Sequence, residues 1–87
     1  MEAAPASDSI ITEILQKVHA RAPKTLCPSE IARALATDRC DWRALMPLVR
    51  TEAAKLAREG KIRVTQRGHD VDATSARGPI RLGATNR

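Results

Sequence analysis

Aromatic residues are almost missing from this chain of 87 residues, which has one Trp, no Phe and no Tyr. A hydrophobic core must therefore be built from Ile, Leu, Val, Ala and Met. The shortage also bears on function, because proteins that bind single-stranded nucleic acid usually stack bases on aromatic side chains. With only Trp42 to offer, the chain is not expected to form such a stacking surface.

Cysteines and long hydrophobic runs are also scarce. The two cysteines, Cys27 and Cys40, are too few for a disulfide framework. They form no CxxC pair, so we expect neither a metal site nor any other cofactor. No stretch approaches the roughly 20 apolar residues of a membrane span, and the N-terminus lacks the features of a signal peptide. We therefore expect a cytoplasmic protein with free thiols and no membrane contact.

Positive charge is what the chain has in excess. Fifteen Lys and Arg residues oppose ten Asp and Glu residues, which gives a net charge of +5. Most of this excess lies in residues 61–87. A basic segment of this kind suggests an acidic partner, and the alternative is a surface that is charged only for solubility.

The length fits a single domain. We place it at residues 7–83, between disordered ends at 1–6 and 84–87, and we find no internal repeat. No amphipathic helix is left over for dimerisation, so we expect a monomer.

Hydrophobic spacing predicts three helices. The first begins at the cap-type residues 7–9 and ends before Pro23, and the second begins at Pro28, a residue that suits the first helical turn. The third runs from an N-cap at Asp41 to a C-terminal glycine at position 60. Pro47 inside the third helix should kink it or divide it in two.

After the third helix the hydrophobic period changes to two, as in a half-buried strand. Residues 61–66 and 79–82 both alternate and are expected to pair, with a turn at 67–68 and a polar loop at 69–76. Residues 24–26 are a short extended candidate. The order helix, helix, turn, helix, hairpin is the winged helix-turn-helix plan, so the predicted fold class is α+β, mainly α.

Four short motifs stand out along the chain: Cys-Pro-Ser-Glu at 27–30, Trp-Arg-Ala-Leu-Met-Pro at 42–47, Val-Arg at 49–50 and Arg-Gly-Pro-Ile-Arg at 77–81. In this order they resemble the bacterial family known as domain of unknown function 3253. The resemblance covers roughly residues 8–83 and implies a winged-helix fold. That family carries no established activity, so the resemblance supplies no catalytic or binding residues.

The third helix carries opposite charges on its two flanks. Arg43 and Arg50 are seven residues apart and project from one side, with Arg58 further round, whereas Glu52 and Glu59 lie on the opposite flank. A basic edge of this kind can approach phosphates, and Arg binds guanine or phosphate through a planar fork of donors. The alternative is that Arg43 and Arg50 cover the edge of the core or pair with Glu side chains.

The hairpin offers a second set of cations in Arg63, Arg67 and Arg77. Gly68 at its tip would let the backbone approach a ligand closely. In winged-helix proteins generally, this part of the fold often touches the DNA backbone. The alternative is a strand edge kept charged to prevent sheet aggregation.

These patterns predict a protein that binds duplex DNA, such as a transcription-related factor. The predicted contacts are Arg43, Arg50, Arg58, Arg63, Arg67 and Arg77. A protein-interaction module of the same fold is the alternative, because Leu48 falls outside the apolar stripe of the third helix. We expect no enzyme. His69, Asp70 and Asp72 form a polar cluster, but no nucleophile or glycine-rich loop accompanies them, and turn chemistry explains them.

Overall fold

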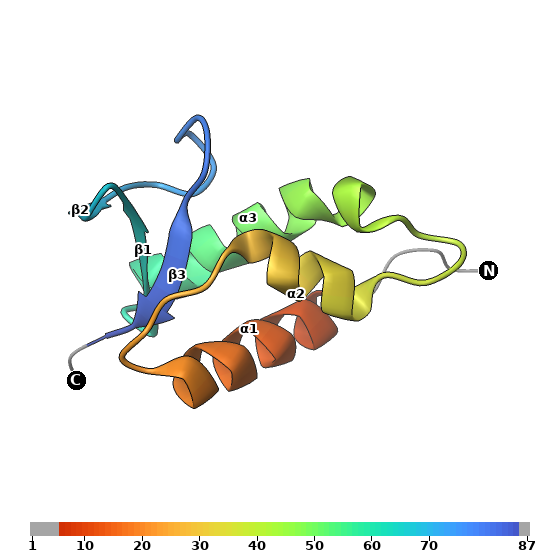
Figure 1. Ribbon diagram of the computed structural model, residues 1–87, viewed down its shortest axis with the longest axis horizontal. Coiled ribbons are helices and arrows are strands. Elements are labelled where there is room, and N and C mark those ends of the chain that lie inside the picture. Colours follow the sequence, from red (N-terminus) through yellow and green to blue (C-terminus); the bar gives the residue numbers. More distant parts are fainter. Residues whose placement is uncertain (1–5, 86–87) are drawn as a thin grey trace.

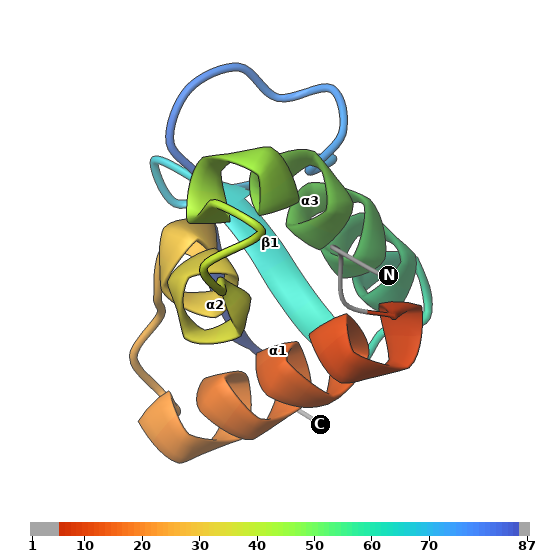
Figure 2. The same cartoon turned by 90° about the vertical axis from the view of Figure 1, so that its right-hand side faces the viewer.

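Three helices and a small antiparallel sheet make up residues 6–85, the part of the chain that this computed structural model describes. The helices are α1 (Ser7–Arg21), α2 (Pro28–Leu35) and α3 (Trp42–Arg58), and the strands are β1 (Ile62–Gln66), β2 (His69–Asp70) and β3 (Arg81–Ala84). Figures 1 and 2 show α1 and α3 on opposite sides of the helical layer, with the sheet packed against one end of α3. The α+β, mainly α class is confirmed, and the arrangement is consistent with a winged-helix-like fold.

The third helix begins and ends where its sequence predicts. The Asp41 carboxylate accepts a hydrogen bond from the Arg43 backbone N–H at 3.3 Å, which caps the first turn. Gly60 follows the helix with φ +75°, a conformation that favours glycine. Pro47 lies inside one continuous helix, so of the two predicted alternatives, a kink or a division, the division is wrong. Pro47 is exposed, and water can replace the hydrogen bond that its ring nitrogen cannot donate.

The sheet has the order β2-β1-β3, with antiparallel neighbours. β1 pairs with β3 from Ile62 opposite Ala84 to Thr65 opposite Arg81, so the predicted pairing of the two alternating segments is confirmed. The extended segment before α2 joins β3 at a single position. There Leu26 exchanges two backbone hydrogen bonds with Leu82, at 2.9 and 2.8 Å.

β2 was not predicted, because residues 69–76 are mostly polar and contain too few apolar residues to suggest a strand. The tight turn at Arg67 and Gly68 explains it. Both residues have positive φ, 54° and 85°, as the two central residues of a tight hairpin turn require. This turn folds His69 and Asp70 back against the end of β1.

The core is aliphatic, as the composition requires. All three helices and the sheet contribute to it. Its largest fully buried side chains are Ile10, Ile14, Val18, Leu26, Ile31, Leu45, Val49, Ile62, Ile80 and Leu82. Leu48 is 40% exposed, as predicted, and no other large hydrophobic residue of the range 6–85 is exposed.

Glu52 contradicts the expectation of an acidic, outward-facing flank, because only 5% of it is exposed. Its carboxylate accepts a hydrogen bond from the Ser7 hydroxyl at 3.1 Å and lies 3.5 Å from the Lys55 ammonium. Ser7 is the first residue of α1, and a negative charge is favourable at the N-terminus of a helix. Glu52 therefore links α3 to the start of α1 rather than marking a solvent-facing edge.

The predicted disordered ends, residues 1–6 and 84–87, fall largely outside the described residues. Ala6 precedes the first turn of α1, and Ala84 completes β3 opposite Ile62. The sheet therefore extends one residue beyond the predicted domain boundary at 83. Within residues 6–85, no helix has the length and apolar character needed to cross a bilayer.

Candidate functional site

Residues 62–84, here called the wing, carry a long connection between β2 and β3 that we call the wing loop (residues 71–80). Both views place the wing loop on the side of α3 away from α1 (Figures 1 and 2). Arg50 of α3 holds this loop in place. Its guanidinium donates to the carbonyls of Ala73 at 3.2 Å, Ala76 at 3.0 Å and Gly78 at 2.7 Å.

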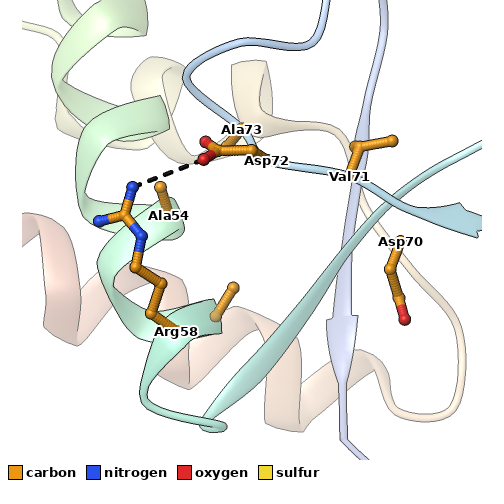
Figure 3. A pocket seen from close by; sticks show the side chains of 7 residues that line it. Ala54, Arg58, Asp70, Val71, Asp72 and Ala73 are labelled. Atoms are coloured by element: carbon orange, nitrogen blue, oxygen red, sulfur yellow. Dashed lines mark ion pairs between the residues drawn. The ribbon is translucent and has the colours of Figure 1, made fainter.

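A second arginine of α3 meets the start of the wing loop. The Arg58 guanidinium lies 3.5 Å from the Asp72 carboxylate, and both line a pocket together with Ala54 and Ala73 (Figure 3). Asp72 in turn accepts hydrogen bonds from Thr74, at 2.8 Å from the backbone N–H and at 2.6 Å from the hydroxyl. Asp72 thus stabilises the turn that begins the wing loop.

These contacts change the acidity of Asp72. The hydroxyl and the backbone N–H of Thr74 hold the pKa of Asp72 below its ordinary value of 3.8. Desolvation opposes this lowering, and Arg58 adds to it. A carboxyl whose folded-state pKa is depressed stabilises the fold above its ordinary pKa, and that stabilisation is lost as pH falls through the lowered value.

We therefore expect Asp72→Asn to lower the unfolding midpoint near neutral pH and to have no effect at about pH 2, where the wild-type carboxyl is also protonated. Thermal unfolding of both proteins across this range measures the difference. Asp38→Asn is the matched control, because the exposed Asp38 side chain makes no hydrogen bond or ion pair with residues 6–85. A difference in unfolding midpoint between wild type and Asp72→Asn that stays constant at every pH would contradict a stabilising role for the ionised Asp72 carboxyl.

Arg63 is also paired within the wing. Its Nε and Nη2 atoms both donate to one carboxylate oxygen of Asp70, at 3.1 and 2.9 Å. Figure 3 shows Asp70 pointing away from Arg58, so the two aspartates of the predicted polar cluster serve different arginines. Asp70 and Asp72 are thereby engaged in exposed ion pairs, one within the wing and one between the wing loop and α3.

The basic flank of α3 therefore faces the wing. Arg50 and Arg58 lie on this flank and both bind the wing loop, and Ala54 between them is 3% exposed. The sequence phase correctly places these arginines on one side of the helix. The structure shows that this side contacts the protein's own wing, so the six predicted arginines do not form one continuous cationic surface.

Two of the predicted arginines do come together, with a third that was not predicted. Arg67, Arg77 and Arg81 line one surface hollow of about 560 Å³, together with Gln66, Gly78 and Pro79. We call these three arginines the wing cluster. No described carboxylate forms an ion pair with any of the three, and none lines the hollow.

The last predicted arginine, Arg43, belongs to a separate group at the α2–α3 turn. The guanidinium of Arg43 lies 4.7 Å from the centre of the Trp42 ring, and that of Arg33 lies 4.3 Å from it, distances typical of cation–π contacts. Arg39 lies in the turn itself and is exposed. Arg33, Arg39 and Arg43, the turn cluster, have one ion pair with the described residues, Arg43 to Asp41 at 3.7 Å.

Sequence reasoning missed Arg33, Arg39 and Arg81. A signal existed for Arg81, because it alternates with the buried Leu82 in a strand pattern and must face outward. Arg39 lies in the predicted polar turn, where exposure is the ordinary expectation. The contact between Arg33 and Trp42 has no local signal, because it depends on how α2 and α3 are packed together.

The candidates for metal binding or thiol chemistry remain separate. Cys27 and Cys40 are free, and the Ser29 hydroxyl donates to the Cys27 sulfur at 3.2 Å. Over residues 6–85, no three side chains of His, Cys, Asp or Glu are close enough together to hold a metal ion.

Comparison with known proteins places this architecture in a family. A family model described as a protein of unknown function, DUF3253, matches residues 7–85. The chain belongs to the DUF3253 family. No curated protein matches its sequence. The resemblance seen in the four motifs is thus confirmed over the whole described fold, and the function of this DUF3253 protein must be argued from its own residues.

Proposed function

We propose that this protein is a cytoplasmic, monomeric winged-helix module that binds duplex DNA and catalyses no reaction. One observation carries the proposal: six exposed arginines that lack a strong acidic partner form two clusters, one at the α2–α3 turn and one on the wing. The turn cluster lies at the N-terminal end of α3, whereas the hollow of the wing cluster includes Gly78, whose carbonyl accepts a hydrogen bond from Arg50 in the middle of the same helix.

The contrast between paired and unpaired arginines supports this proposal. Asp72 and Asp70 form ion pairs with Arg58 and Arg63 and partly neutralise their positive charge. These two arginines are therefore less available to an external anion. The arginines of the two clusters keep exposed guanidinium groups whose charge adds to a net +5. Phosphates of duplex DNA are the natural partners of such groups, since binding releases condensed counterions.

A mixed-sequence duplex should therefore bind at low salt, and binding should weaken steeply as salt rises. The variant Arg39→Ala/Arg43→Ala should weaken binding and reduce the slope of log K against log salt by about two units, one for each lost phosphate contact. Fluorescence anisotropy at several salt concentrations measures both quantities.

Arg58→Ala/Arg63→Ala is the matched control, because it removes the same formal charge from arginines that are already paired. We expect it to leave the salt slope within about half a unit of the wild-type value. Absence of binding at low salt would overturn the proposed function. An equal loss in both double variants would show that net charge alone, and not the turn cluster, drives association.

The alternative function, a protein-interaction module, draws support from Leu48, which is 40% exposed on α3. It is the single exposed large hydrophobic of the described range, and one exposed leucine is ordinary for a globular protein. The two arginine clusters therefore favour DNA. Leu48→Ala should leave duplex binding unchanged if DNA is the partner.

A further inference from the structure

The hollow lined by the wing cluster, here called the wing hollow, has the composition of an anion-binding site. Its three arginines come from separate segments: Arg67 from the β1–β2 turn, Arg77 from the wing loop and Arg81 from the start of β3. Its remaining lining residues, Gln66, Gly78 and Pro79, carry no charge. The lining of this hollow therefore contains three arginines and no carboxylate. Outside the hollow, Glu30, whose pKa is lowered mainly by Arg21, also interacts with the charge of Arg81.

The arginines of the hollow are attached to a backbone that the structure fixes. Arg67 lies in the tight hairpin turn. The Gln66 side-chain amide donates to the carbonyls of Arg77 at 2.6 Å and Pro79 at 3.1 Å, which holds the end of the wing loop against β1. A site whose backbone is already ordered loses less conformational entropy when a ligand binds.

Arg81 is also oriented before any ligand arrives. Its Nε donates to the Thr25 hydroxyl at 3.0 Å and its Nη2 to the Thr25 carbonyl at 2.9 Å, which leaves Nη1 free of these contacts. Gly83 makes this approach possible, because a Cβ at that position would lie 2.9 Å from the Thr25 methyl group. The segment before α2 thus sets the direction of an arginine in the wing.

We propose that the wing hollow binds the diphosphate group of a small molecule, a site that goes beyond duplex binding. Each phosphodiester of a duplex carries a single negative charge, whereas a terminal phosphate alone carries about 1.5 to 2 near neutral pH. A compact diphosphate therefore matches a hollow lined by three arginines better than one backbone phosphate does. A guanidinium group can also donate two parallel hydrogen bonds to the oxygens of one phosphate.

The consequence is competition at the wing. A diphosphate bound in the hollow occupies the same arginines that would contact the DNA backbone there. The turn cluster is unaffected, so the ligand should weaken duplex binding without abolishing it.

The test is calorimetric titration with inorganic pyrophosphate at fixed ionic strength, with sulfate as a comparison anion. We expect one saturable site in the wild type, unchanged in Arg39→Ala/Arg43→Ala and weakened at least about tenfold in Arg67→Ala/Arg77→Ala. The two double variants remove the same charge, so a difference between them reports location. Arg67→Lys/Arg77→Lys keeps the charge but removes the paired N–H donors of the guanidinium groups. It should also weaken pyrophosphate binding while preserving the midpoint of thermal unfolding.

Equal weakening in both alanine double variants, or no saturation by about 10 mM, would overturn this inference, because weak surface attraction behaves in that way. Duplex titrations separate this failure from that of the proposed function. Duplex binding that depends on the turn cluster, in a protein that ignores pyrophosphate, refutes only the ligand site. Pyrophosphate bound at the wing, in a protein that ignores duplex, refutes only DNA binding.

Discussion

Arg50→Ala is expected to release the wing loop from α3 while the three helices stay folded. The guanidinium is the shared donor for the carbonyls of Ala73, Ala76 and Gly78. Hydrogen bonds from a charged donor each contribute about 1.5 to 3 kcal/mol, and partial solvation of this loop reduces the total loss to the order of 2 kcal/mol. Amide hydrogen exchange should then accelerate roughly 30-fold in residues 71–80 and remain slow in α1.

Two further variants make this prediction specific. Arg50→Lys keeps the charge, but a single ammonium cannot reproduce the forked geometry that reaches three carbonyls, so it should also accelerate exchange in the wing loop. Arg43 lies on the same side of α3 seven residues earlier and makes no hydrogen bond or ion pair with the described residues of the wing, so Arg43→Ala should leave exchange unchanged. Slow exchange in Arg50→Ala would show that other contacts hold the loop.

Release of the wing loop would also disturb the wing hollow. Gly78 accepts the shortest of the three Arg50 hydrogen bonds and also lines the hollow beside Arg77. Arg50 is therefore a positioning residue for the wing cluster. Pyrophosphate affinity should fall in Arg50→Ala even though Arg67, Arg77 and Arg81 are all retained.

Most of the fold follows from local patterns in the sequence. Apolar spacing located α1 and α3. The cap at Asp41 and the glycine at position 60 predicted the ends of α3, and Pro23 predicted the end of α1. α1 begins at Ser7 as predicted, but its N-cap is Ala6 and no side chain caps it, so the capping role expected of residues 7–9 is wrong. The alternation in β1 and β3 predicted their pairing. The exception, β2, has two residues, too few for any period to be visible, and it exists because the turn before it directs the chain back along β1.

The candidate site was less predictable, for a physical reason that Arg50 illustrates. Helical phase determines which side chains share a side of α3, but it does not determine what packs against that side. Arg50 and Arg58 share the predicted basic flank, and the wing loop covers it. Glu52 shows the reverse case, since its burial depends on the start of α1, which lies 45 residues earlier in the chain.

Leu82→Ala should have the largest effect on stability, because this side chain joins the two halves of the fold. Leu82 is fully buried, pairs with Val64 of β1 and meets Leu26 from the segment before α2. Removing a buried leucine side chain costs about 2 to 5 kcal/mol, from lost burial and the cavity left behind, so the melting temperature should fall by at least about 10 °C. Its backbone hydrogen bonds with Leu26 are retained in the variant, so the loss reports side-chain packing.

Leu48→Ala is the same substitution at the exposed leucine of α3, and it should change the free energy of unfolding by no more than about 0.5 kcal/mol. Chemical denaturation of the two variants under identical conditions measures the difference directly. Comparable losses would mean that β3 and the segment before α2 do not share a core. The segment before α2 also supplies Thr25, so the Leu26–Leu82 contact lies directly beside the hydrogen bonds that orient Arg81 in the wing hollow.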